Sequence, residues 1–148
     1  MAAEVAKGAV ASGRIVSNHA LQIETRSRVE FKDMTALIEA AIRGSGIEEG
    51  LCHVFTPHTT AAILINENDD WSLQKDFDDY LGRLAPRDGE YHHNDGNCDA
   101  HLKAATLGCS KTLMIDKGKL VLGRWQGVFY CEFDGPRRRE VRLKIVSD

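Results

Sequence analysis

The stretch KTLMIDKGKLVLGRWQGVFYCEFDGPRRREVRLKIV, residues 111–146, decides the fold class. Its runs of apolar and β-branched residues are interrupted by turn-forming segments at 116–118, at Gly123 and at 134–136. Strand runs separated by short turns predict a meander of hairpins. We therefore expect the last third of the chain to be largely antiparallel β-structure.

Earlier in the chain, three more segments have the pattern of strands. Residues 19–25, HALQIET, alternate between apolar and polar side chains, as a half-buried strand does. Two apolar, β-branched runs follow at 51–56 and 60–66, and Pro57 separates them. His58 is expected at the break between these two strands.

Three segments instead have the spacing of helices. Residues 31–46 contain an apolar stripe, with Asp33 as an N-terminal cap and Gly44 as the stop. Residues 68–86 form an amphipathic pattern with acidic residues at its start, and residues 99–108 form a short helix that ends at a glycine. Together with the strands, these helices predict one α+β domain over residues 13–148, a β-sandwich or antiparallel meander with two or three helices, after a flexible terminus over residues 1–12.

The composition excludes several classes of protein. Nineteen Lys and Arg residues against 22 Asp and Glu residues give a net charge of -3, so no overall positive field favours nucleic acid or an anionic membrane. Apolar runs such as 61–65 are far too short to span a bilayer, and the first residues lack a signal-like apolar core. The four cysteines form no C-x-x-C pair, and most are expected to be small buried hydrophobes. We expect a cytoplasmic protein.

Histidines gather in EYHHNDGNCDAHL, residues 90–102. His93 and His101 can converge where a loop enters a helix, because Asp99 is a candidate cap that places His101 in the first helical turn. Imidazole and thiol groups both suit zinc, so Cys98 is a further candidate ligand. His92 and His93 alternate in direction in extended backbone, so only one of them is expected to join a site. The spacing alone leaves a metal site and a polar surface loop equally open.

Two further segments carry polar side chains beside predicted strands. His58 in HTT can bind a metal through neutral imidazole or can simply be satisfied in a turn, and Glu67 can serve as a general base or orient a histidine. In FDGPRRRE, strand alternation places Arg137 and Arg139 on one face, where they can bind phosphate or carboxylate or stay solvated. GRWQG, residues 123–127, lines a pocket or fills the core. Signatures of serine hydrolases, P-loop NTPases and zincins do not occur.

Five motifs in this order give the chain a resemblance to a known family. HTTA, INEN, AHLKA, LGxWQG and DGPRRR, together with PRDGEYHH, resemble the YjbQ-like family, whose members are often described as secondary thiamine-phosphate synthases. The resemblance covers nearly the whole chain from about residue 13. It implies an α+β fold around a β-sandwich, a homotrimer, and a histidine metal site near the subunit contacts.

Matched motif by motif, the resemblance implies His58, His93 and His101 as the metal ligands. It favours His93 over His92, which stands where the family commonly has glutamate, and it lowers the expectation that Cys98 binds metal. Arg124 stands where the family commonly has threonine. Three imidazoles favour zinc, whereas magnesium is the usual partner of a diphosphate.

The reaction implied for the family joins a pyrimidine-methyl diphosphate to a thiazole phosphate and releases pyrophosphate. We expect Glu67 to act as base, and Arg137 and Arg139 to contact the anion. Two alternatives stay open at this point. One is a metal-dependent hydrolase of unknown substrate, and the other is a non-enzymatic trimer that binds a metal or a small molecule.

Overall fold

The described chain, residues 4–6 and 13–148 of a computed structural model, combines antiparallel sheets with helices. It has the α+β class that the sequence predicts. Its elements in chain order are β1 (Glu4–Ala6), β2 (Val16–Glu24), β3 (Glu30–Asp33), α1 (Thr35–Ser45), β4 (Gly50–Phe55), β5 (Ala61–Glu67), α2 (Trp71–Leu84), α3 (Cys98–Leu107), β6 (Ser110–Asp116), β7 (Lys119–Leu120), β8 (Gln126–Glu132) and β9 (Arg138–Ser147).

Part of the expected flexible terminus falls outside this description. Residues 1–3 and 7–12 lie outside the described residues, whereas residues 4–6 form strand β1, which pairs with β2. The division into a flexible segment 1–12 and a single domain 13–148 stays a prediction.

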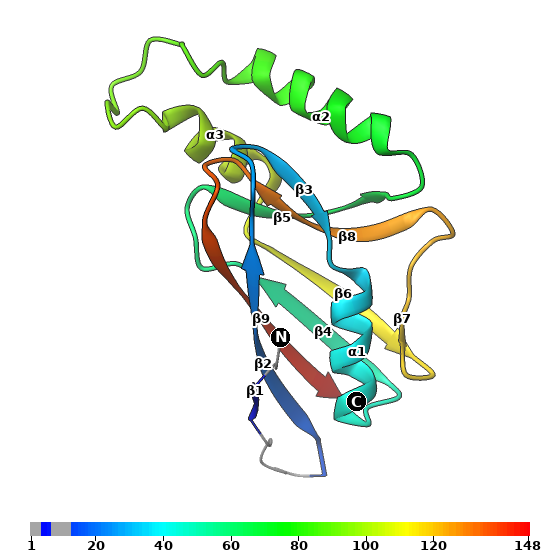
Figure 1. Cartoon of the computed structure of the whole chain (residues 1–148). Coiled ribbons are helices and arrows are strands. Elements are labelled where there is room, and N and C mark those ends of the chain that lie inside the picture. Colours follow the sequence, from blue (N-terminus) through cyan, green and yellow to red (C-terminus); the bar gives the residue numbers. More distant parts are fainter. Residues whose placement is uncertain (1–3, 7–12) are drawn as a thin grey trace.

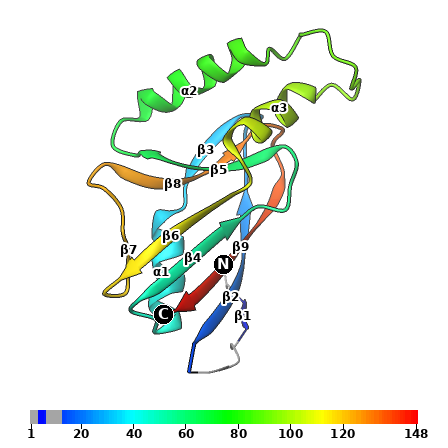
Figure 2. The ribbon, with the colours of Figure 1, turned by 180° about the vertical axis from the view of Figure 1, so that it is seen from behind.

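The strands form two sheets. The larger sheet has the order β1-β2-β9-β4-β6-β7 and the smaller has the order β3-β8-β5, with antiparallel pairing in both. The smaller sheet crosses one end of the larger one, and α2 and α3 lie on the side of it that faces away from the larger sheet (Figures 1 and 2). Helix α1 lies beside the larger sheet and packs on the core between the sheets.

Strand β8 is covered on both faces, which gives the molecule two cores. Val128 and Tyr130 point into the core shared with the larger sheet and α1. Phe129, Cys131 and Phe133 point into a second core beneath α2 and α3. The smaller sheet is therefore the middle layer of the molecule.

This arrangement corrects the expected meander. Strands β6 and β7 do form a hairpin, but β8 and β9 lie in different sheets although only the turn 133–137 separates them. GRWQG also does not fill the core, because Trp125 is half exposed and Gly123 N donates to Gln126 Oε1 at 2.7 Å within a surface turn. A strand with two covered faces lacks the polar alternation that would have shown which sheet it joins.

The helix boundaries follow local chemistry. Asp70 Oδ1 accepts from Ser72 N at 2.9 Å at the start of α2, as expected of an N-terminal cap. Asp33 is not the expected cap of α1, because Met34 holds the cap position; Asp33 lies one residue earlier and its Oδ1 accepts from Thr35 N at 2.9 Å. The expected stop at Gly44 is wrong. Helix α1 continues to Ser45, and Gly46 adopts the left-handed conformation (φ 73°) that glycine tolerates best.

Helix α2 has the predicted amphipathic stripe, yet little of that stripe is covered. Leu81 is buried and Phe77 packs near Phe31, with 6.2 Å between the ring centroids. Tyr80 and Leu84, which belong to the same stripe, are 53% and 59% exposed. Within the described segments, no helix combines the length and the hydropathy that crossing a membrane requires.

Candidate functional site

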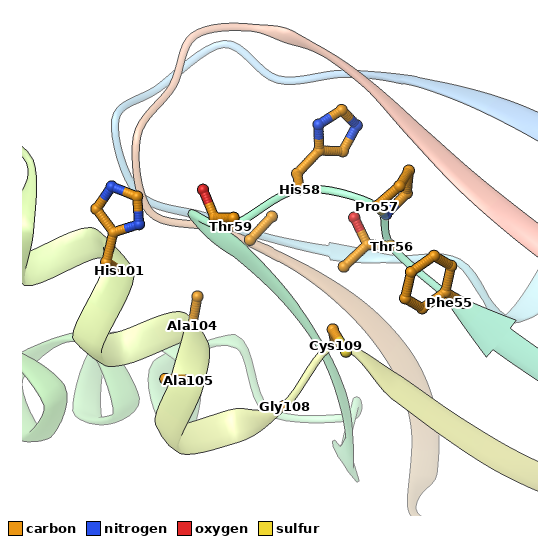
Figure 3. A pocket seen from close by; sticks show the side chains of 11 residues that line it. Phe55, Thr56, Pro57, His58, Thr59, His101, Ala104, Ala105, Gly108 and Cys109 are labelled. Carbon is orange, nitrogen blue, oxygen red and sulfur yellow. The ribbon is translucent and has the colours of Figure 1, made fainter.

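A cavity of about 660 Å³ lies between the β4–β5 connection and α3 (Figure 3). This volume falls in the range of small-molecule sites, and most of the lining is apolar, as in such sites. Three polar side chains lie along one edge of the cavity, which we call its rim: His58 and Thr59 come from the connection and His101 comes from the helix. Its remaining lining residues are Phe55, Thr56, Pro57, Ala61, Ala104, Ala105, Gly108 and Cys109.

Helix α3 presents one face to this cavity. Positions 101, 104, 105 and 108 are spaced by three or four residues, so they lie along one side of the helix. The two alanines leave room for a ligand where larger side chains would fill the space. Sequence reasoning identified His101 but missed the alanines and Cys109, because no pattern distinguishes them from ordinary helix and strand residues.

His58 is held by the backbone of strand β9. The N–H of Glu140 donates to His58 Nε2 at 2.9 Å. Burial, and after it the positive charge of Arg139, hold the pKa of His58 below its ordinary value, so the ring is neutral at pH 7. A neutral imidazole has one ring lone pair and one N–H, and here the lone pair is on Nε2. The hydrogen is therefore on Nδ1.

His93 and His101 come together, as the sequence suggested. Their ring centroids are 5.1 Å apart and the rings are nearly perpendicular, at 88°. His93 lies on the loop before α3, and His101 lies in the helix. His92, its neighbour in the loop, is exposed and makes no contact of this kind within the described structure.

The protonated nitrogen of His93 follows from its neighbours. Nε2 lies 3.2 Å from Asn97 Oδ1 and 3.5 Å from Asp95 Oδ2, and both are acceptors. Asn97 must turn its oxygen to His93, because its Nδ2 donates to Asp134 Oδ2 at 2.9 Å. Nε2 of His93 therefore carries a hydrogen, and in the neutral ring Nδ1 has the lone pair that a metal or a proton requires.

A set of buried charges fixes the start of α3. Asp99 is 1% exposed and accepts from Arg28 Nη2 at 3.0 Å and from Lys103 Nζ at 3.1 Å. Arg28 Nη1 also lies 3.4 Å from Asp134 Oδ1. Asp99 is therefore not the expected cap. It lies within the first turn of α3, and Asn97 holds the cap position.

This charge set ties α3 to the Asp134 turn and so positions His101 and Asn97. The Asp99–Lys103 pair has the i, i+4 spacing of helix ion pairs and was visible in the sequence. Arg28 carries no local signal, because its partners are distant along the chain. Sequence reasoning missed it for that reason.

The two arginines expected to bind an anion are placed differently from each other. Arg139 is 5% exposed, and its Nε donates to Glu132 Oε1 at 2.9 Å while its Nη2 donates to Thr60 Oγ1 at 2.8 Å. Arg137 is about half exposed and pairs with Asp134 at 3.1 Å. Neither belongs to the described cavity lining.

Glu67 lies at the far end of β5 from the cavity. It is paired with Gln126, whereas Ala61 at the other end of the strand lines the cavity. Six strand residues at about 3.3 Å each separate the two ends by about 20 Å. Glu67 and His58 of the same chain are therefore not neighbours.

The expected three-histidine metal set does not fit a metal ion as the residues stand. Among the described residues, no three His, Cys, Asp or Glu side chains converge as a metal would require. The lone pair of His58 is engaged by Glu140 N–H, which leaves His93 and His101 as the two adjacent imidazoles. Catalytic zinc usually has three protein ligands.

Comparison with known proteins gives consistent matches over most of the chain. A family model described as UPF0047 protein YjbQ-like matches residues 19–148. A UPF0047 protein of Methanocaldococcus jannaschii is 47% identical over 127 residues, covering 86% of this chain and 92% of the relative. The UPF0047 protein YugU of Bacillus subtilis is 42% identical over 128 residues, covering 86% of this chain and 97% of YugU.

Solved structures show the same fold. A Clostridium acetobutylicum protein, described as an uncharacterized YugU ortholog, is 44% identical with a TM-score of 0.83, covering 85% of this chain and 98% of its own. A Sulfolobus solfataricus protein of unknown function is 33% identical with a TM-score of 0.88, covering 91% of this chain and 99% of its own. Neither description states an activity.

Proposed function

Because the chain belongs to the UPF0047 YjbQ-like family, we propose that its histidine-rimmed cavity is the active site of a small enzyme that acts on a phosphorylated small molecule. One observation carries this proposal. His58 and His101 stand on the rim of one cavity, and His93 is adjacent to His101. Titratable groups at the mouth of a mostly apolar cavity are the usual setting for catalysis.

The reaction we propose is that of a thiamine-phosphate synthase-like transferase. It joins a pyrimidine-methyl diphosphate to a thiazole phosphate and releases pyrophosphate. Three points support it: the motif resemblance, a cavity large enough for a heteroaromatic ring, and polar groups at its rim for the phosphates. Arg137 is the better candidate for contact with anions, because its side chain is half exposed, whereas the guanidinium of Arg139 is buried against Glu132.

We also propose that His93 and His101 bind a transition metal ion such as zinc. Their rings are close, and Nδ1 of His93 has a free lone pair while Asn97 holds its Nε2. His93 and His101 would hold such an ion, and it would supply positive charge near the leaving group. Asn97 would orient the ligand, as partners of metal-bound histidines commonly do.

A homotrimer is the assembly that we propose for this chain. The resemblance supports it, and so does the exposed apolar surface of α2, where Tyr80 and Leu84 on one face are more than half exposed and Trp71 at the start of the helix is 76% exposed. A large exposed apolar patch on a soluble protein commonly marks a contact surface.

The first experiment measures pyrophosphate release by the purified protein. Release is expected only when both substrate halves are present, and His101→Ala should lower the rate by at least about 100-fold. His92→Ala is the matched control, because this exposed histidine precedes His93 in the chain but its ring is not part of the His93–His101 ring pair. Release from the diphosphate alone would instead indicate a hydrolase, and no release under either condition would reject the transferase.

The second experiment tests the metal separately by elemental analysis. The wild-type protein and His92→Ala should retain zinc after dialysis, whereas His93→Ala and His101→Ala should lose most of it. Equal zinc content in all four proteins would rule out the histidine pair as its site.

A further inference from the structure

His58, which lines the cavity, and His93, which lies beside the lining residue His101, differ in the ring nitrogen that their neighbours engage. His93 directs the hydrogen of Nε2 to Asn97 and Asp95 and keeps a lone pair on Nδ1. His58 does the reverse, since its Nε2 lone pair accepts the N–H of Glu140 and the hydrogen is on Nδ1. The two rings are therefore suited to different partners, although both are histidines of one site.

We propose that His58 is a hydrogen-bond donor, through Nδ1–H, to an anionic oxygen of the ligand and is not a metal ligand. This assignment rests on the proposed function, because it names the role of one residue within the same cavity. It also replaces the expectation that His58 completes a set of three metal-binding histidines.

Each route to metal binding by His58 disturbs the contact with β9. Ligation through Nε2 would take the lone pair from the Glu140 amide and leave that backbone N–H without its partner, which is unfavourable. Ligation through Nδ1 would move the hydrogen to Nε2, where it would face the amide hydrogen. The backbone of β9 thus specifies the donor form.

The direction of His58 Nδ1 indicates which ligand atoms its hydrogen can contact. In Figure 3 the nitrogen on the side away from β9 faces the part of the rim that carries Thr59 and His101. The hydroxyl of Thr59 lies between His58 and His101 in this view and can donate as well. Two donors at the mouth of an apolar cavity suit an oxygen acceptor such as a phosphoryl or carboxylate oxygen.

Neutrality of the ring agrees with this role. Burial and Arg139 hold the pKa of His58 below its ordinary value. A charged ring would carry a hydrogen on both nitrogens, and the one on Nε2 would face the amide of Glu140. His58 therefore offers one N–H to the cavity over the physiological pH range.

The decisive measurement is the tautomer of His58 in the full-length protein. With ¹⁵N-labelled histidine, long-range ¹H–¹⁵N spectra distinguish the two neutral forms for each of the six histidines. The His58 signals are identified by their loss in His58→Asn. We expect the hydrogen on Nδ1, a shift of that nitrogen when pyrophosphate is added, and shifts of His93 and His101 but not of His58 when zinc is added.

Two variants test the same assignment in binding. The amide of His58→Asn can place an N–H where Nδ1 was, whereas His58→Gln reaches only toward the position of Nε2. We expect His58→Gln to weaken pyrophosphate binding by about 10-fold or more, as loss of a hydrogen bond to a charged group does, and His58→Asn to weaken it less. Zinc content should stay unchanged in both variants.

A hydrogen on Nε2 of His58, zinc loss in both variants, or equal pyrophosphate affinity in wild type and His58→Gln would each overturn the assignment. Failure of the proposed function is distinguishable from these results. It would appear as absence of product from the two substrate halves, while the tautomer and the pyrophosphate titration still support the donor role of His58.

Discussion

Asn97 is a single residue on which the geometry of the histidine pair depends. Its Nδ2 donates to Asp134, and its Oδ1 faces His93 Nε2. Asn97→Ala removes the acceptor that fixes the His93 ring. We expect zinc affinity to fall by about 10–100-fold, the usual loss when a partner of a metal-bound histidine is removed.

Isothermal titration of the apoprotein with zinc would measure this change. Asn94→Ala is the control, because this exposed side chain lies in the same loop. If both variants bound zinc as tightly as the wild type, Asn97 would have no part in orienting His93.

A second residue, His19, makes stability depend on pH. It is buried on the core face of β2, with Nε2 2.7 Å from Ser17 Oγ, and burial holds its pKa below the ordinary value. The unfolded chain therefore takes up a proton near pH 6.5 while the folded protein does not. The free energy of unfolding should fall as the pH drops through about 6.5 toward the lower folded pKa.

Urea unfolding between about pH 8 and pH 5 measures this effect. His19→Gln removes the titrating group, so the slope of unfolding free energy against pH should become smaller. It should not vanish, because the pKa of His58 is lowered too and contributes with the same sign. An unchanged slope in His19→Gln would contradict the role of His19.

At the scale of elements, one buried ion pair joins the two sheets. Glu132 of β8 and Arg139 of β9 are 0% and 5% exposed, and Thr25 Oγ1 also donates to Glu132 at 2.8 Å. Arg139→Met leaves a buried carboxylate without its partner. We expect it to lower the free energy of unfolding by about 3–5 kcal/mol, and the double variant with Glu132→Leu to recover much of that loss.

Urea unfolding of the single and double variants tests the pair. Arg138→Met is the control, because Arg138 and its partner Glu24 are exposed, and its effect should stay below about 1 kcal/mol. A double variant less stable than Arg139→Met would show that the two side chains do not act as a pair.

Most elements were predictable from the sequence, but their pairing was not. Alternation in β2 and the acidic residues at the start of α2 are local signals, and the structure confirms them, with Asp70 as the N-cap of that helix. The sheet to which β8 belongs depends on partners far along the chain, and its two covered faces remove the alternation that would have indicated it. The sequence therefore predicted the strands correctly and the meander incorrectly.

The candidate site, too, was predictable only in part. The convergence of His93 and His101 was predictable, since both lie where a loop enters a helix. The hydrogen bond from Glu140 to His58 was not predictable, because it joins β9 to a segment about 80 positions earlier in the chain. The burial of Arg139 was not predictable either, because it depends on the contact of β9 with Glu132 in the other sheet.

For the whole molecule, the testable property is assembly. A trimer of this 16.4 kDa chain should elute with three times the monomer mass in size exclusion with light scattering. Replacing Trp71 and Leu84 of α2 with serine should shift the protein toward the monomer, because the variant loses exposed apolar surface that a second copy can cover.

Lys75→Ser is the control for this experiment, since Lys75 is an exposed charged residue on the same helix. A wild-type protein of monomer mass would refute the trimer. An intact trimer in the serine variant would place the contact elsewhere.

Because both faces of β8 are covered, different parts of the molecule should open at different rates. Amides of a strand enclosed between two cores exchange with deuterium only when most of the structure opens, whereas helix α2, held mainly by Leu81 and Phe77, can open locally. Hydrogen exchange should therefore be slowest at β8 and faster at α2 and at the loop that carries His93. The histidine pair then combines one ring on a quickly fluctuating loop with one on a helix packed against the slowest part of the chain.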